Sequence, residues 1–297
     1  MSLHAETQGL VWQRSYVIVS SYTNFDNLAH GPRGTEATHS IRTFQLDNRT
    51  GALTLVSINN EAMNPAFSRF HPNLNVFYTC TESIVDEGEV VAYDLDGRTG
   101  ALTFRSKQKC AGSSTCYITI DHTLQHMLLV NYWDSTLTTL QLNHEGTPIS
   151  IKQVLDPKKG KKLIANPKKH VNHSHNDENT IRERQSDPHS HALVLDPMLD
   201  CIAFVPDLGM DVVRQLFYDH STGKLMENCL IQPGPDKFKP HGPRYIEFHK
   251  HLPVAYVVNE LGCNVSVFTF DKLAVRFLIK SLPCASCYSW GCRPHWH

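Results

Sequence analysis

The chain has 297 residues, of which 41% are hydrophobic and 19% charged, and it carries a formal net charge of −1. This composition excludes a largely disordered chain, and the near-zero charge excludes a general attraction to nucleic acid or to an anionic membrane. Any site for an anion therefore has to be local.

The amino-terminal sequence has no basic region followed by a long apolar stretch, and nowhere do eighteen apolar residues follow one another. We therefore expect a cytoplasmic protein with no membrane and no nucleic-acid partner. The nine cysteines are an odd number, and most stand singly beside strand-like segments. This distribution favours reduced, partly buried thiols over disulfides.

Short strand-like segments dominate the chain, and no helical periodicity of any length accompanies them. The segments are rich in β-branched and aromatic residues and are bounded by Gly, Pro, Asn or Asp, which is typical of strands in an all-β protein. In chain order they are YVIVSSY (16–22), NVFYTC (75–80), EVVAYDL (89–95), YITIDH (117–122), HMLLVNYW (126–133), TLTTLQL (136–142), ALVLD (192–196), CIAFVPD (201–207), RYIEFH (244–249), VAYVVNE (254–260) and NVSVFTFD (264–271).

The strands recur as one unit: a turn, a strand, an Asp or His corner, a second strand with a polar end, a third strand, and a fourth after a glycine. The anchor positions Pro65, Thr115, Pro188 and Pro243 are about 50, 73 and 55 residues apart. Four-stranded units at this period predict a β-propeller. We count four nearly whole units and a partial first one that lacks its inner strand, or about five blades.

A second repeat marks the turn between the outer two strands of a unit. DNRTGALTLV at 47–56 returns as DGRTGALTFR at 96–105, and more loosely as DHSTGKLMEN at 219–228. An Asp followed by a Gly at this spacing is typical of a hairpin turn.

These patterns divide the chain into an extension at 1–14, a propeller domain at 15–271 and a divergent tail at 272–297. The long third interval of the repeat is explained by a polar insert at 156–187. The insert is rich in Lys and His but has no interleaved aromatic residues, so we interpret it as a solvated loop.

The tail contains Cys284, Cys287 and Cys292, followed by His295 and His297. A pair of cysteines two residues apart suits zinc, but the spacing of the remaining residues does not match small zinc modules. We therefore expect no metal and no other cofactor.

Polar residues stand where first strands begin and second strands end. Because these two strands are antiparallel neighbours, both positions lie at the same mouth of the central channel. Any one of these residues could simply cap a strand, but His, Arg and Glu together at a concave mouth are typical of an anion-binding or acid/base site. The residues placed there are Asn64, Glu82, Thr115, Asn131, Tyr132, His189, His191, Asp207, Arg244, Asn259 and Glu260.

Four motifs occur in order: Arg-Gln-x-x-Pro-His-x-His at 184–191, Pro-Asp-Leu-Gly at 206–209, Gly-Pro-Arg at 242–244 and Asn-Glu-Leu at 259–261. Together with GSSTCYITIDHTLQHMLLVNYW, they resemble the lactonase family of seven-bladed propellers, over residues 15–271. That family includes bacterial 6-phosphogluconolactonases and the fungal carboxy-cis,cis-muconate cyclase. At Cys116 the chain departs from the family, in which many members carry a histidine nearby.

The resemblance implies metal-independent hydrolysis of a sugar-type lactone, foremost 6-phosphogluconolactone of the pentose phosphate pathway. A histidine or a carboxylate would take a proton from water, and a guanidinium would stabilise the oxyanion or bind an anionic group. We predict catalytic roles for His191, His189, Arg244 and Glu260, and substrate-binding roles for Arg214, Asn131, Asp207 and Asn259. Either His191 or Glu260 could be the base.

The family pattern continues for about two more blades, which supply another arginine and the closing strand. The chain therefore resembles a member truncated at the carboxyl end, and its open strand edges favour self-association. Two alternatives to a hydrolase stay open: a non-catalytic binding module, and a cyclase that acts in the lactonising direction.

Overall fold

The computed structural model describes residues 14–28, 34–158, 183–236, 238–271 and 276–278. The first sheet has three strands, β1 (Ser15–Ser20), β2 (Ile41–Leu46) and β3 (Leu53–Asn59). The second has β4 (Pro65–Phe70), β5 (Val76–Thr81), β6 (Glu87–Leu95) and β7 (Leu102–Ser113). The third has β8 (Thr115–Ile120), β9 (His126–Asn131), β10 (Leu137–Leu142) and β11 (Pro148–Leu155). The fourth has β12 (Val194–Leu195), β13 (Ile202–Asp207), β14 (Val212–Asp219) and β15 (Lys224–Ile231), and the fifth has β16 (Pro243–Phe248), β17 (Val254–Asn259), β18 (Asn264–Asp271) and β19 (Arg276–Leu278).

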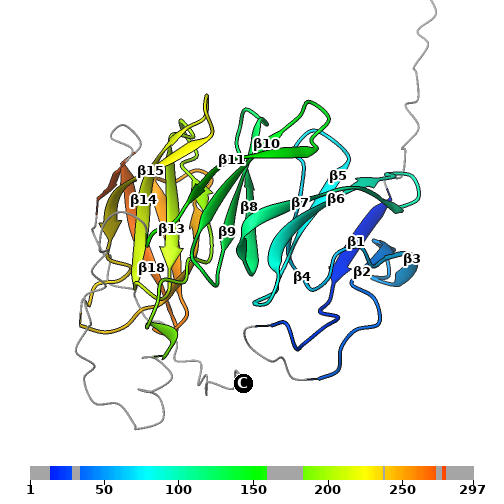
Figure 1. Ribbon diagram of the computed structural model, residues 1–297, viewed down its shortest axis with the longest axis horizontal. Helices are drawn as coiled ribbons and strands as arrows, with labels where there is room; N and C mark the ends of the chain where they lie inside the picture. The colour runs from blue at the N-terminus through cyan, green and yellow to red at the C-terminus, as the bar shows by residue number, and fades with distance from the viewer. Residues whose placement is uncertain (1–13, 29–33, 159–182, 237, 272–275, 279–297) are drawn as a thin grey trace, which may run out of the picture.

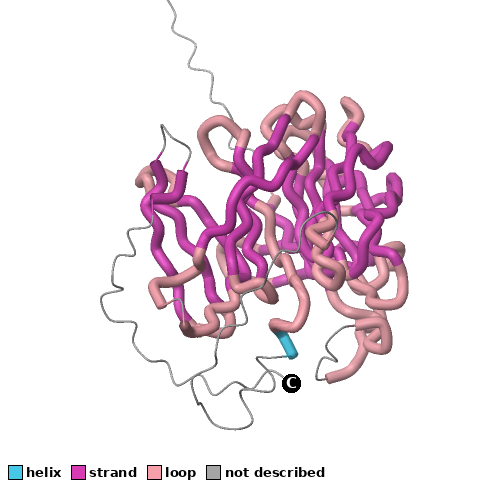
Figure 2. Tube along the Cα trace, turned by 60° about the vertical axis from the view of Figure 1, so that its left-hand side comes forward, coloured by secondary structure: helices cyan, strands magenta, loops and turns pink. Residues whose placement is uncertain are grey.

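Each sheet is antiparallel and keeps the chain order of its strands. In Figure 1 the sheets follow one another across the molecule from β1–β3 to β16–β19. In the part of the chain that the structure describes, Figure 2 shows one short helical piece among the strands. No helix of the described residues is both long and apolar enough to span a bilayer. Four complete four-stranded sheets and one of three strands are the predicted propeller blades.

The core lies between neighbouring sheets. Four clusters of buried apolar side chains each join one sheet to the next, from the first pair of sheets to the last. The first strands lie nearest the common axis, because Tyr117 of β8 contacts Phe67 of β4 at 4.4 Å and Tyr245 of β16 at 6.0 Å between ring centroids. These aromatic rings therefore fill the axis of the molecule.

The outer turns form as the repeat predicts. The carboxylates of Asp47, Asp96 and Asp219 each accept backbone N–H groups two or three residues further on. Gly51, Gly100 and Gly223 adopt φ angles of 75°, 76° and 71°. Only a residue without Cβ enters this left-handed region at low cost, which explains the recurrent Thr-Gly.

One predicted anchor is displaced. Pro65, Thr115 and Pro243 each pair with the last residue of the second strand, but in the fourth sheet that partner is Ser190, which bridges to Asp207. Pro188 was therefore the wrong anchor by two residues, because the prolyl motif resembled the other turns while the pairing register follows the strand.

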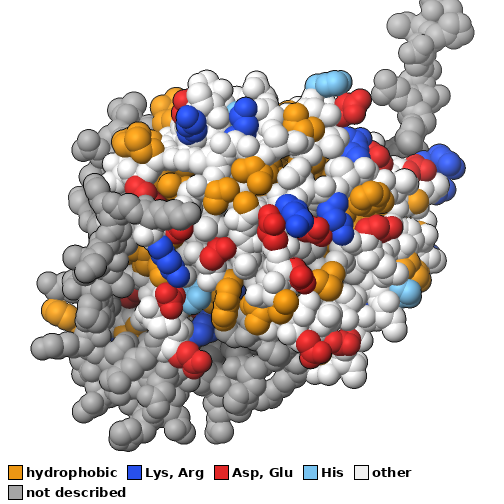
Figure 3. All heavy atoms as spheres, viewed as in Figure 1, with side chains coloured by type: hydrophobic (Ala, Val, Ile, Leu, Met, Phe, Trp, Pro, Cys, Tyr) orange, Lys and Arg blue, Asp and Glu red, His pale blue; other side chains and the backbone are white. Residues whose placement is uncertain are grey.

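The division of the chain at residues 14 and 271 stays a prediction. The strand β19 lies beyond residue 271, and the segments 1–13, 159–182 and 279–297, with the cysteine-rich tail and most of the polar insert, lie outside the described residues. Figure 3 shows acidic and basic side chains interspersed over one face. One ion pair of the described residues, Lys107 with Glu89 at 3.1 Å, joins β7 to β6.

Candidate active site

The first strands of the second, third and fifth sheets each carry one extra residue at the amino-terminal end. Cys116 of β8 stands between two residue pairs and has no partner on β9. The same one-residue shift isolates Ala66 in β4 and Arg244 in β16. Such a bulge bends the strand and re-aims the side chain of the extra residue. The repeat therefore aims one side chain per blade at the end of the channel that we call the mouth.

The fourth blade follows the same register. The bridge between Ser190 and Asp207 takes the place of the first residue pair of the second, third and fifth blades. The pairing of β12 with β13 is shifted by one residue relative to this bridge, as in those blades. His191 follows the bridged residue, as Arg244 follows Pro243. His191 and Arg244 are thus equivalent positions of adjacent blades.

The residue after each second strand also lies at the mouth. Its backbone N–H donates to the carbonyl oxygen of the residue before the first pair, which closes the hairpin. The four bonds are Glu82 to Asn64 (2.9 Å), Tyr132 to Ser114 (2.9 Å), Leu208 to His189 (2.9 Å) and Glu260 to Gly242 (2.7 Å). Main-chain atoms therefore close the hairpin without help from the side chains of these four residues.

Two arginines bind Glu260 from different segments. Arg244 of β16 donates to one carboxylate oxygen at 2.5 Å, and Arg184, which precedes the fourth blade, donates to the other at 2.8 Å. The second guanidinium also reaches the hydroxyl of Tyr132 at 3.4 Å. Among the described residues no atom accepts a hydrogen bond from the buried Nε of Arg184.

The charges of the arginines decide the state of Glu260. Burial by itself would raise the pKa of Glu260, but the charges and hydrogen bonds of Arg244 and Arg184 outweigh burial and lower that pKa below its usual value. Glu260 is therefore ionised at neutral pH. Two guanidinium groups around one carboxylate leave one net positive charge, which suits an anionic ligand.

His191 is a buried neutral imidazole beside this cluster. Its ring contacts those of Tyr132 at 5.3 Å and Tyr245 at 5.2 Å. Burial lowers the pKa of His191 to about 3, and the charge of Arg244 acts in the same direction. Its Nδ1 is buried without a hydrogen-bond partner among the described residues. At neutral pH His191 is therefore uncharged and can accept a hydrogen bond at its unprotonated ring nitrogen.

His189 lies at the same mouth but in a different setting. Its ring stacks on Tyr132 at 4.8 Å and lies 6.0 Å from the ring of Trp133. Its Nδ1 lies 3.2 Å from the carbonyl oxygen of Tyr132. Of the two histidines of the motif, His191 is the one whose ring borders Tyr245 and feels the charge of Arg244.

Asp207 occupies the bridged position and is completely buried. Its carboxylate accepts hydrogen bonds from the hydroxyls of Ser190 and Ser135 and from the backbone N–H groups of His189 and Met210, at 2.7 to 2.9 Å. The acceptor capacity of this carboxylate is thus used by the protein itself.

The other three predicted substrate-binding residues are also buried inside the blades. Arg214 donates to Ser190 at 3.0 Å and pairs with Glu227. Asn131 bonds to three threonine hydroxyls, and Asn259 donates to Asn264 and Ser266. All three bind the protein rather than face the mouth.

Sequence reasoning did not nominate Arg184, and it placed Tyr132 at the mouth without assigning it a catalytic or substrate-binding role. The signal for Arg184 was present, since it opens the Arg-Gln-x-x-Pro-His-x-His motif. The signal for Tyr132 was its register, because it follows Asn131 as Glu260 follows Asn259. The described residues contain no group of three His, Cys, Asp or Glu side chains that could hold a metal ion.

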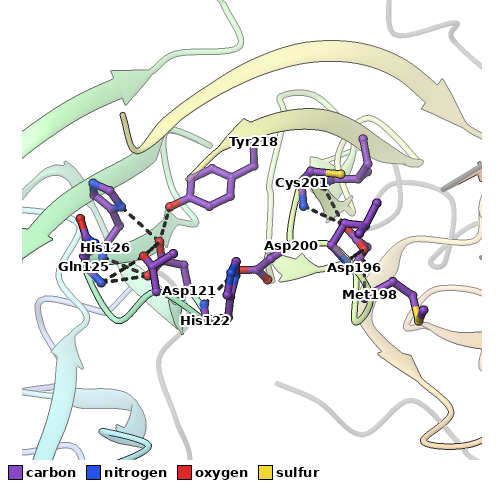
Figure 4. A network of polar contacts seen from close by, with 12 residues as sticks. Asp121, His122, Gln125, His126, Asp196, Met198, Asp200, Cys201 and Tyr218 are labelled. Carbon is purple, nitrogen blue, oxygen red and sulfur yellow. Dashed lines mark hydrogen bonds and ion pairs between the residues drawn. The ribbon is translucent and has the colours of Figure 1, made fainter. Parts of the chain in front are cut away.

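A separate cavity of about 530 Å³ lies at the opposite end of the sheets, where first strands turn into second strands. Figure 4 shows its polar network, in which the buried Asp121 accepts from Tyr218 of the next blade and His122 pairs with Asp200 at 2.7 Å. This network joins the third and fourth blades and does not include the arginine cluster.

Comparison with known proteins shows the family to which the chain belongs. The family model "Lactonase, 7-bladed beta-propeller" matches residues 16–288. The 6-phosphogluconolactonase of Bacillus subtilis strain 168 is 27% identical over 80% of this chain and 60% of its own length, and that of Formosa agariphila is 23% identical over 80% and 62%. The periplasmic gluconolactonase of Pseudomonas aeruginosa superposes with a TM-score of 0.67 at 20% identity, over 89% of this chain and 66% of that one. The chain thus spans about three fifths of the length of the two curated relatives.

Proposed function

Because the chain belongs to the lactonase family of seven-bladed β-propellers, we propose that it hydrolyses a sugar-type lactone, 6-phosphogluconolactone foremost, at the mouth described above. The names of the two curated relatives support this substrate. The single observation that carries the proposal is the cluster of Arg244, Glu260 and Arg184 beside the neutral His191.

In the proposed reaction a water molecule attacks the carbonyl carbon of the lactone. Glu260 or His191 takes the proton of the water, and both are unprotonated at neutral pH because of their lowered pKa values. Arg244 stabilises the oxyanion or holds the anionic group of the substrate. The ring C–O bond then breaks, and the proton passes to the ring oxygen to give the open hydroxy acid. These steps require no metal.

Asp207, Asn131, Asn259 and Arg214 take a different part in this proposal from the one first predicted. Their buried hydrogen bonds support a role in positioning the neighbouring residues His191, Tyr132 and Glu260. His189 supports Tyr132 by stacking. We also retain as predictions a cytoplasmic location and self-association through open strand edges.

The test is hydrolysis of freshly prepared 6-phosphogluconolactone, corrected for spontaneous opening, by the wild type and by Arg244→Ala. We expect saturable hydrolysis in the wild type and a loss of about 10²- to 10³-fold in the variant, as for removal of one oxyanion donor. Arg98→Ala, at an exposed outer turn, is the matched control and should keep full activity. A folded wild type without saturable hydrolysis would instead support a non-catalytic binding protein.

A further inference from the structure

A second polar pair stands at the mouth in the second blade. The hydroxyl of Tyr22 donates to the carboxylate of Glu82 at 2.6 Å. The segment that carries Tyr22 is fixed to this blade by the buried Asn64, whose side chain accepts from the N–H groups of Thr23 and Asn24 and donates to the carbonyl of Asn24. The pair is therefore held rigidly although it joins two different blades.

The pair lies at the same end of the blades as the arginine cluster. Glu82 occupies the position in its blade that Glu260 occupies in the fifth. Burial and then the charge of Glu82 raise the pKa of Tyr22, while the charge of Arg244 acts in the opposite direction. The pKa of Cys116 is raised mainly by burial, and both Arg244 and Glu82 act on it electrostatically. Cys116 itself contacts the carbonyl oxygen of His191 at 3.4 Å, so the bulged positions of the third and fourth blades adjoin at the mouth.

The two carboxylates differ in their partners. Glu260 is bound by two guanidinium groups, whereas Glu82 forms no ion pair within the described part of the chain and contacts a neutral hydroxyl. A carboxylate has about four acceptor sites, so Glu82 keeps acceptor capacity after binding Tyr22. The mouth therefore has a cluster with net positive charge in the fifth blade and, in the second blade, a carboxylate with remaining acceptor sites.

We propose that Tyr22 and Glu82 form a subsite for the hydroxyl groups of a polyhydroxylated lactone whose single anionic group is bound by Arg184 and Arg244. This inference rests on the proposed function, because it assigns the two ends of the same substrate. Sugar hydroxyls donate hydrogen bonds to a carboxylate, and a charged acceptor strengthens each bond.

The subsite also discriminates between lactone classes. A muconate-type lactone presents carboxylates in place of hydroxyls, and one of them would meet Glu82 as a like charge. Juxtaposed like charges are a strong element of specificity. The charge pattern of the mouth therefore favours sugar lactones over the lactone of a carboxymuconate.

The test is calorimetric binding of two unreactive probes to the full chain. Glucose 6-phosphate presents a phosphate and a hydroxylated ring without a lactone carbonyl, and inorganic phosphate presents the anion alone. We expect Glu82→Ala to raise the Kd of glucose 6-phosphate roughly tenfold, as for loss of a hydrogen bond to a charged group. The Kd of inorganic phosphate should change by less than about twofold. Tyr22→Phe should show the same pattern with a smaller loss.

Arg184→Ala is the matched control and should weaken the binding of both probes. Equal losses for both probes in Glu82→Ala, no loss for either, or no binding of either probe by the wild type would overturn the subsite. Should Glu82→Ala not fold, Glu82→Gln keeps the shape of the side chain and should follow the same pattern. Preferential binding of glucose 6-phosphate without lactone hydrolysis would refute the proposed function but support the subsite. Lactone hydrolysis without that preference would support the proposed function but refute the subsite.

Discussion

The two ends of the blades differ in the groups that accept hydrogen bonds from the backbone N–H groups there. At the corner end, where first strands turn into second strands, side chains accept the N–H groups of the turn. The acceptors are the Nδ1 of His71 and His249 and the carboxylates of Asp121 and Asp196. At the mouth, main-chain carbonyls accept the N–H groups that close the hairpins, those of Glu82, Tyr132, Leu208 and Glu260.

This difference explains at which end of the blades the side chains can differ from one repeat to the next. A corner position requires an acceptor, because a buried N–H without a partner is costly, so each repeat has either Asp or His there. The side chain at a bulged mouth position does not have to accept a backbone N–H group. The four blades have Ala66, Cys116, His191 and Arg244 there. The repeated fold thus leaves its mouth free to carry a site while its corners hold the blades.

The largest effect should come from Asp207, which lies at the mouth but in the bridged position. Asp207→Ala leaves two buried hydroxyls and two N–H groups without their acceptor. We expect the free energy of unfolding to fall by about 4 kcal/mol, measured by urea denaturation. A loss under about 1 kcal/mol would contradict a structural role for Asp207.

A corner substitution should lower stability by somewhat less. The carboxylate of Asp196 accepts four backbone N–H groups, those of Met198, Leu199, Cys201 and Ile202. Asp196→Ala should lower the free energy of unfolding by about 3 kcal/mol, while turnover per folded molecule stays unchanged. Asp200→Ala, which removes the pair with the His122 ring and one hydrogen bond from the backbone N–H of His122, is the milder control. Loss of turnover in the folded Asp196 variant would show that the two ends are not independent.

His191 should couple stability to pH. Its pKa is about 3 in the folded chain against 6.5 for an unperturbed histidine, so the unfolded chain binds this proton first as pH falls. Stability is then lost between pH 6.5 and 3, by about 2 kcal/mol from pH 6.5 to 5. In urea denaturation at several pH values, His191→Gln should lack this part of the pH dependence. Identical pH dependence in both proteins would contradict a buried neutral imidazole.

The smallest effect should come from Cys116, whose thiol lies 3.4 Å from the carbonyl oxygen of His191. Burial raises the pKa of Cys116, so the thiol stays protonated and unreactive. We expect Cys116→Ser to change the free energy of unfolding by less than about 1 kcal/mol, because the hydroxyl can form the same contact. Mass spectrometry after iodoacetamide treatment should find Cys116 unmodified in the native chain; rapid modification would contradict this burial.

Much of the fold was predictable because the repeat is local. The Asp-x-x-Thr-Gly turns, the Asp or His corners and the partial first unit all depend on residues close together in the chain, and all appear as predicted. The convergence of His191, Arg244 and Glu260 at one mouth also follows from hairpin pairing. The displaced anchor at Pro188 shows the limit, because the register of a strand depends on its partner.

The sequence by itself determined the strands, the four-stranded unit, the outer turns and the end of each blade at which polar residues stand, because period and turn chemistry act over a few residues. Tertiary structure alone decided which side chains meet. Arg184 reaches Glu260 across 76 residues, and Tyr22 reaches Glu82 across 60. Such contacts depend on the stacking of one blade on the next and on the one-residue bulges that aim the mouth side chains.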